Sequence, residues 1–289
     1  MASLKEIKSR IQSVGSTRKI TSAMKMVSSA KLRKSQKMIE NFLPYENKLN
    51  TLLTNFLNAD TDITLPLAAE RKVERVAIVA VSSNSSLCGA FNSNVIRVFN
   101  QTLAEYKNLG EENIAIYPVG KKVTAAVRKV GYTPQAHYEE LAEKPAYDAV
   151  ATIAEQLMQD FLDKKIDKVE LIFHHYKSKN SQVLQRETFL PVSLKTDDSK
   201  RDKELYYLIE PNRELILNEL IPKVIKLKLY AALLDSNASE HAARTMAMQI
   251  ATDNANDLMQ ELTLQYNKSR QQAITAELLD ITGATFGMQ

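Results

Sequence analysis

Apolar residues recur at helical spacing at the start of the chain. They follow one another at intervals of three and four residues, the seam spacing of a coiled coil: Leu4, Ile7, Ile11 and Val14. Ser3 and Glu6 form a capping box just before this pattern. No glycine or proline lies between Gly15 and Pro44. The pattern therefore predicts a helix over 1–57, which we expect Pro44 to kink or interrupt.

The end of the chain carries a longer helical pattern. Neither glycine nor proline occurs between Pro222 and Gly283, and apolar residues continue at helical spacing across this range. We expect a second helix of about 75 residues within 205–289, on the order of 110 Å long. The apolar positions that we expect to form the seam include Ile20, Met24 and Val27 in the first helix and Ile250, Leu258, Leu262 and Ile274 in the second.

Between these helices, short β-branched runs alternate with helical ones. The run from Val76 to Val81 is continuously apolar, as expected for a strand buried on both faces, and 114–120 is a second strand. Alternating runs at 167–176 and 181–192 are typical of a hairpin. The remaining predicted elements are helical faces at 91–106, 123–130 and 147–161 and a weak strand at 134–138. This order predicts a small doubly wound sheet with an antiparallel edge.

The two long helices are expected to pack on each other, because a helix with a narrow apolar stripe is unstable alone. The chain leaves the first helix, forms the sheet and returns, so the pair should be antiparallel. The predicted fold class is α+α/β: a long antiparallel two-helix coiled coil from 1–57 and 205–289, which form one discontinuous unit, with a central Rossmann-like α/β domain at 73–195. Small residues should allow close approach along the second helix: Ala238, Ala242, Ala243, Ala247, Ala251 and Ala255.

Composition excludes several classes of protein. The 289 residues are 44% hydrophobic and include only 7 glycines, 8 prolines and one cysteine, which excludes a disordered chain, a collagen-like chain and a disulfide-stapled miniprotein. No stretch approaches the roughly 18 apolar residues of a membrane span, and the start has no secretory signal pattern. We expect a protein that is cytoplasmic or peripheral to a membrane.

Charge is unevenly distributed despite a net charge of only +4. Residues 1–37 contain ten basic side chains and one acid, whereas residues 235–289 contain seven acids and three bases. Nucleic acid is a possible partner of the basic segment, but no aromatic residue lies between Met1 and Asn41 to stack on bases. An acidic protein surface is the favoured partner.

Few residues carry a catalytic pattern. The turn at 81–92 follows the first strand, where α/β folds often bind phosphate, but it has a single glycine and lacks a phosphate-loop motif, so a capped turn is favoured. Cys88 has no local histidine signature. His174 and His175 are adjacent on a predicted strand, so they point to opposite faces and cannot bind one metal together. We expect no catalytic residue, cofactor or metal.

Three parts of the chain carry a family resemblance. These are IKSRIQSVGSTRKITSAMKMVSSAKLRKSQ near the start, the turn SSNSSLCGAFN, and SEHAARTMAMQIATDNANDL with YNKSRQQAITAELLDITGA near the end. With these strings the whole chain resembles the γ subunits of F-type ATP synthases. The resemblance implies a central-stalk rotor without a catalytic site of its own. It implies as partners a hexamer of α and β subunits, the ε subunit and the membrane c ring.

The resemblance also assigns individual residues. Met24, with Lys25 beside it, matches the family's contact with an acidic loop of the β subunit. The residues that match further contacts are Arg244, Gln271, Thr275 and Glu277 with the hexamer, and Tyr207 and Glu210 with ε and the c ring.

Two differences from the chloroplast and mitochondrial members of this family narrow the expected source of the chain. Cys88 has no second cysteine, so the redox switch of chloroplast members is not expected, and the family pattern starts close to Met1 without a transit peptide. These features favour a bacterial subunit at the cytoplasmic face of the plasma membrane. The alternatives that stay open are a nucleotide-binding enzyme that dimerises through its helices and a basic coiled-coil protein that binds nucleic acid.

Overall fold

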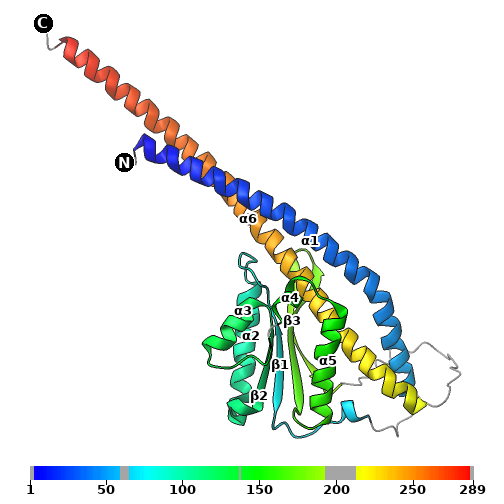
Figure 1. The fold of residues 1–289 in the computed structure, drawn as a ribbon. Helices are drawn as coiled ribbons and strands as arrows, with labels where there is room; N and C mark the ends of the chain where they lie inside the picture. Colours follow the sequence, from blue (N-terminus) through cyan, green and yellow to red (C-terminus); the bar gives the residue numbers. More distant parts are fainter. Residues whose placement is uncertain (1–2, 59–64, 137, 193–212, 287–289) are drawn as a thin grey trace. The chain divides into compact units, whose positions relative to one another are not determined.

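Figure 1 shows the computed structural model of the chain, which describes residues 3–58, 65–136, 138–192 and 213–286. The chain forms two compact units. The helix-pair unit comprises Met1–Ser29 and Arg244–Gln289, and the sheet unit comprises Ala30–Ala243. Two long helices contribute residues to both units: α1 (Leu4–Asn58) and α6 (Arg213–Phe286).

The sheet unit contains one four-stranded sheet in the order β2-β1-β3-β4. β1 (Val76–Val81) lies between β2 (Ile114–Val119) and β3 (Lys168–Ser178) and pairs in parallel with both. β4 (Ser181–Leu190) pairs antiparallel with β3 at the edge. All residues of β1 are buried, which explains its uninterrupted apolar sequence. The predicted doubly wound sheet with an antiparallel edge is confirmed.

Helices cover both faces of this sheet (Figure 1). α2 (Phe91–Tyr106) and α3 (Lys121–Lys129) pack on the face that contains Ile78. α5 (Tyr147–Leu162) and the first turns of α6 pack on the face that contains Val79. The short elements are α4 (Glu139–Glu143) and three 3-10 helices, η1 (Pro66–Ala68), η2 (Lys107–Leu109) and η3 (Glu111–Asn113).

Within the sheet unit, α1 and α6 run antiparallel. Ser35 Oγ donates to Asn237 Oδ1 at 2.7 Å. About two helical turns further along both helices, the rings of Phe42 and Tyr230 meet edge to face with centroids 5.3 Å apart. Leu32 packs on alanines of α6. Small side chains at this interface allow the close approach that the alanine pattern predicts.

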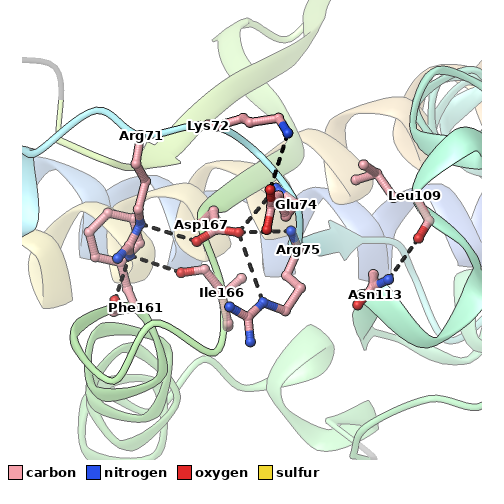
Figure 2. Close-up of polar contacts among 9 residues, drawn as sticks. All are labelled: Arg71, Lys72, Glu74, Arg75, Leu109, Asn113, Phe161, Ile166 and Asp167. Carbon is pink, nitrogen blue, oxygen red and sulfur yellow. Dashed lines mark hydrogen bonds and ion pairs between the residues drawn. The ribbon is translucent and has the colours of Figure 1, made fainter.

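Arg71 and Asp167 anchor the segment that leads into β1 (Figure 2). Nη2 of Arg71 donates to the carbonyl oxygens of Phe161 and Ile166 at 2.5 and 3.0 Å, and its Nε lies 3.3 Å from Asp167 Oδ1. Asp167 Oδ2 accepts the backbone N–H of Arg75 at 2.9 Å. These bonds fix the end of α5 and the starts of β1 and β3 against one another.

A buried ionic network crosses the sheet beside α2. The carboxylate of Glu170, 3% exposed, lies 2.7 Å from Lys168 Nζ and 3.1 Å from Arg186 Nε, and it accepts the hydroxyl of Tyr106 at 2.7 Å. Arg186 also pairs with Glu105 at 2.7 Å. Burial acts to raise the pKa of Glu170, but the bonds from Arg186, Lys168 and Tyr106 outweigh it, so the pKa lies below its ordinary value.

Of the two outcomes expected at Pro44, a kink or an interruption of the helix, the interruption is wrong and the kink stays a prediction. α1 continues through Pro44 to Asn58. A proline inside a helix costs roughly 3 kcal/mol because it removes a hydrogen bond and crowds the preceding turn. Here the proline is exposed, and the helix packs on both sides of it, through Phe42 before it and Leu53 after it. Tertiary packing offsets the local cost.

The expected weak strand at 134–138 is also absent from the residues that the structure describes there. The N–H of Gln135 donates to the carbonyl oxygen of Ile116 at 2.9 Å, so the segment touches the edge of β2. Pro134 has no N–H to extend that pairing. The helix α4, which the sequence did not suggest, begins at Glu139.

Candidate functional site

Polar side chains join α1 to α6 in the helix-pair unit. Arg18 Nη1 donates to Asn256 Oδ1 at 3.3 Å, and Lys25 Nζ donates to Gln249 Oε1 at 2.9 Å. Between these pairs, the hydroxyl groups of two threonines, one on each helix, are hydrogen-bonded. Numbers rise along α1 as they fall along α6, so the helices are antiparallel in this unit too, which confirms the predicted orientation.

The buried seam of this unit is formed largely by small and hydroxyl side chains. Thr21, Ser28, Thr245 and Thr252 are buried, and Thr245 is only 1% exposed. Gly15 faces α6 so closely that an added Cβ would lie 3.9 Å from the sulfur of Met259. The buried apolar contribution to the seam comes from Ile7, Met248, Ala255 and Leu262.

Five of the large apolar side chains expected in the seam are exposed instead. Ile20 and Val27 of α1 are 60% and 58% exposed, and Ile250 of α6 is 56% exposed. Leu258 and Ile274 are exposed as well, so the predicted seam is wrong at these five positions. We call the exposed large apolar side chains of the helix-pair unit the outer stripe: Ile20, Met26, Val27, Ile250, Leu258, Leu264, Ile274, Leu278, Leu279 and Ile281.

The reversal has a simple physical origin. Hydroxyl and glycine positions let two backbones approach closely, and the hydroxyl groups of Thr21 and Thr252 are both hydrogen-bonded. Beside Thr21 and Ser28, bulky side chains in the seam would hold the helices apart, and Ile20 and Val27 point outward there. Large apolar side chains that are exposed in numbers on one unit are candidates for an interaction surface. The outer stripe is therefore the candidate functional site.

The residues assigned by resemblance fall in different settings. Met24 and Lys25 are half-buried on α1, and the ammonium of Lys25 bonds Gln249. Arg244 is buried, at 8% exposure. Gln271, Thr275 and Glu277 are exposed near the end of α6, where the Thr275 hydroxyl donates to the carbonyl oxygen of Gln271 at 2.9 Å. Tyr207 and Glu210 lie outside the described residues.

Basic side chains accompany the outer stripe on α1. Within residues 3–29, Lys5, Lys8, Arg10 and Lys19 are exposed. They give the exposed surface of this part of α1 an excess of positive charge, which suits an acidic partner surface.

The turn after β1 bonds to itself. Asn92 Oδ1 accepts the N–H of Ser83 at 3.1 Å, and Asn92 Nδ2 lies 3.1 Å from the sulfur of Cys88, which is buried. Asn84 Oδ1 accepts the N–H of Lys121 at 2.9 Å. The N–H groups of Ser83 and Lys121 are thus engaged by side chains of the turn. The N-cap residue of α2, Ala90, makes no side-chain cap bond, so the side chains of the turn brace the turn and not the start of the helix.

His174 and His175 have opposite environments, as the strand pattern predicts. His174 is 2% exposed and stacks on Phe91 with centroids 4.3 Å apart, and burial lowers its pKa to about 4. His175 is half-exposed and contacts Asp235 of α6 at 2.5 Å. Across the described ranges, no group of three or more His, Cys, Asp or Glu side chains is arranged to hold a metal ion. Of the helices in those ranges, none has the length and apolar character needed to cross a bilayer.

An antiparallel helix pair with hydrogen bonds across its seam, joined in one chain to a doubly wound sheet, defines the α+α/β class of protein to which this chain belongs. The family model for ATP synthase matches residues 3–286. Relatives named ATP synthase gamma chain support the match. The chain belongs to the ATP synthase gamma-chain family.

These relatives are bacterial and match nearly end to end. The gamma chain of Bacteroides fragilis is 61% identical over 288 residues, covering 99% of both chains. That of Phocaeicola vulgatus is 57% identical over 287 residues, again covering 99% of both, and that of Christiangramia forsetii is 45% identical over 285 residues, covering 98% of both.

Solved structures share the fold. A chain in the Euglena gracilis mitochondrial ATP synthase, OSCP/F1/c-ring, has a TM-score of 0.65 and 21% identity, covering 99% of this chain and 94% of the other. A chain in the central stalk/c-ring structure of the Tetrahymena thermophila mitochondrial ATP synthase has a TM-score of 0.58 and 23% identity, covering 80% of this chain and 99% of the other.

Proposed function

We propose that this chain is the central-stalk rotor of an ATP synthase. In this role it transmits torque between a membrane c ring and a catalytic hexamer of α and β subunits. Proton flow then drives ATP synthesis, or ATP hydrolysis drives proton pumping. The chain supplies no catalytic site and holds no cofactor of its own, and ATP is made and cleaved by its partners.

The outer stripe is the observation that supports this proposal. Burying one large apolar side chain contributes roughly 1.5–3 kcal/mol, so ten such positions can hold a partner firmly. Apolar contacts are also non-directional. A partner can slide across them without leaving buried hydrogen-bonding groups unpaired, which would cost about 1–3 kcal/mol each. A surface of this kind suits a bearing in which contacts change as the shaft turns.

A shaft that transmits torque also needs two helices that do not slide along each other, and the polar seam between α1 and α6 supports this. Interhelical hydrogen bonds such as Lys25 to Gln249 have defined partners, so they fix the register of α1 on α6. A seam of alkyl side chains alone would permit slippage more readily. Torque applied to one helix is then carried by both.

We assign the partner contacts as follows. Met24 and Lys25 meet an acidic loop of the β subunit, where Lys25 can use a second of its three donors while it bonds Gln249. Gln271, Thr275 and Glu277 are exposed and available to the hexamer. Arg244 is buried, so a contact with the hexamer requires its side chain to leave that packing.

The contacts with the ε subunit and the c ring are assigned to the sequence between β4 and α6. We propose that Tyr207 and Glu210 contact the ε subunit and the c ring. The complex then holds this chain at the cytoplasmic face of a bacterial plasma membrane as a peripheral subunit. We also retain the domain division 1–57, 73–195 and 205–289 as a proposal about how these roles are distributed along the chain.

Co-purification tests the assembly. A tagged chain expressed with its partner subunits should be recovered with three α and three β subunits per copy. Recovery as a stable homodimer without them, or measurable binding of ATP to the isolated chain, would instead support the enzyme alternative. DNA or RNA binding that falls steeply with salt would support the nucleic-acid alternative.

Met24→Lys tests the assignment on α1. The change adds a cation beside the acidic loop and should impair the coupling of ATP hydrolysis to proton pumping, while the complex still assembles. Met24→Leu, which conserves volume and charge, is the matched control and should retain coupling. Equal coupling in both variants would refute the placement of Met24.

A further inference from the structure

A cavity of about 350 Å³ lies inside the sheet unit, between α1, the β3–β4 hairpin and α6. Its volume falls in the lower part of the range of small-molecule sites, roughly 300–1,000 Å³. It is separate from the outer stripe, because its lining residues all belong to the sheet unit.

One part of the lining is apolar and aromatic. Phe42 comes from α1, Leu171 and Phe173 from β3, and Leu234 from α6. Leu171 and Leu234 are otherwise buried, at 0% and 2% exposure, so this wall is held firmly by the core. A planar ring or short alkyl group is the chemistry that such a wall accommodates.

The other part of the lining is charged and has an excess of acids. Lys228 is the only lysine or arginine among the lining residues, and it already pairs with Glu187 at 3.1 Å. Asp235 contacts His175 Nδ1 through Oδ2 at 2.5 Å. Burial raises the pKa of Asp235 even though the His175 bond acts to lower it. Only Oδ2 of Asp235 has a side-chain contact with His175, and Asp235 lines the cavity.

We propose that this cavity is a binding site for a small amphipathic cation, an aromatic or alkyl ammonium compound. The apolar part lies against Phe42 and Phe173, and the ammonium group donates to Oδ1 of Asp235. Charge-assisted bonding to a partly buried carboxylate supplies the selectivity for a cation. The aromatic rings favour an ammonium group over a neutral group of the same size.

Occupation of the cavity has a structural consequence. The ligand contacts α1, the hairpin and α6 together, so it stabilises their packing by mass action. This consequence concerns the sheet unit only and holds whether or not the proposed rotor function is correct.

The test uses the purified full-length chain and 2-phenylethylammonium as the probe, with neutral 2-phenylethanol as the comparison. Titration calorimetry, and chemical shifts of labelled leucine methyl groups, measure binding. For a probe of this size we expect a dissociation constant of ~1 mM with one site per chain. The methyl signals of Leu171 and Leu234 should shift, and the alcohol should bind at least tenfold more weakly.

Three variants locate the site. Asp235→Asn should weaken binding of the cation at least tenfold but leave binding of the alcohol unchanged. Ala231→Leu, which fills the cavity, should abolish binding of both. Asp163→Asn removes an exposed carboxylate that pairs with Lys165 away from the cavity, and it should bind like the unmodified chain. Circular dichroism of each variant checks folding, and the methyl shifts of the unmodified chain give the answer if a variant fails to fold.

The outcomes are distinct. Saturable binding that depends on Asp235 and on the space beside Ala231 supports the proposal. Absence of saturable binding, equal affinity for the alcohol, or binding that Ala231→Leu leaves intact overturns it.

Discussion

The hydroxyl groups of Thr21 and Thr252 lie 2.8 Å apart in the buried seam between α1 and α6. Each also lies within hydrogen-bonding distance of a carbonyl oxygen of its own helix, Thr21 of Arg18 and Thr252 of Met248. One hydroxyl can therefore donate across the seam while the other donates within its helix. This bond helps to fix the register of α1 on α6 at a position where the two facing side chains are both threonine.

A double-mutant cycle measures this contribution. Thr21→Val and Thr252→Val should each destabilise the helix pair by about 1 kcal/mol, because each change removes the hydrogen bond across the seam. The double variant should cost less than the two changes added together, and the coupling energy should be about 1 kcal/mol. Denaturant unfolding followed by circular dichroism gives these values. Thr17→Val, at an exposed position, is the control, and strictly additive costs would contradict the account.

Gly120 should tolerate no side chain. Its φ is +99°, and an added Cβ would lie 2.2 Å from the carbonyl oxygen of Ser82. Gly131 has nearly the same φ, +98°, with no atom within 4 Å of the added Cβ. Gly131→Ala should cost about 1–2 kcal/mol from backbone strain alone, and Gly120→Ala should cost at least about 4 kcal/mol or prevent folding. Similar melting temperatures for the two variants would show that the close approach is absent.

Arg186→Met should destabilise the sheet unit by about 3 kcal/mol, because it leaves the buried carboxylate of Glu170 without its guanidinium partner. Glu105→Gln alters the exposed side of the same network and should change stability little. Urea unfolding of both variants at neutral pH makes the comparison. A small cost for Arg186→Met would mean that Lys168 and Tyr106 suffice to stabilise Glu170.

His174 should make stability depend on pH. Burial lowers its pKa to about 4 in the folded chain, below the ordinary value of 6.5, so the unfolded chain binds more protons between these values. Stability from this group is complete above pH 6.5 and is lost as pH falls toward 4, by roughly 3 kcal/mol. His174→Phe should remove this part of the pH dependence, whereas His175→Gln should retain it. The measurement is the free energy of unfolding of the unmodified chain and of both variants from pH 7 to 4. The same dependence of this free energy on pH in all three proteins would contradict the assignment to His174.

Glu170 adds a second component with the same direction. Its pKa is lowered in the folded chain, so its stabilisation is present above the ordinary glutamate pKa and is lost as pH falls below it. The window lies at more acidic pH than that of His174. The His174→Phe variant should therefore still lose stability in acid, but only below about pH 4.5.

Much of the fold follows from the sequence because local pattern and packing agree. The β-branched run at Val76–Val81 forms the predicted buried strand, β1. The alternating runs on either side of Asn180 form the predicted hairpin. The same holds at the start of α1, where the Ser3 hydroxyl accepts the N–H of Glu6 at 3.2 Å. The interruption expected at Pro44 does not occur, because the local cost of the proline is offset by contacts that are distant in sequence, such as Phe42 with Tyr230.

The seam was harder to predict than the helices. Helical spacing of Ile20 and Val27 identifies a face of α1, but periodicity does not say whether that face meets α6 or an external partner. The deciding signal is the run of small and hydroxyl residues on the adjacent face, Thr21 and Ser28, which only close approach of α6 explains. The cavity beside Asp235 had no sequence signal, because its lining comes from three elements that are far apart in the chain.

Single-molecule rotation tests the central claim most directly. Lys129 is exposed on α3 and Cys88 is buried, so a bead can be attached selectively to a cysteine introduced by Lys129→Cys. The chain is assembled with its α and β partners, and the hexamer is fixed to a surface. The account predicts that ATP turns the bead in one direction, with three steps per turn to match three catalytic sites. Continued ATP hydrolysis with a stationary bead would contradict it.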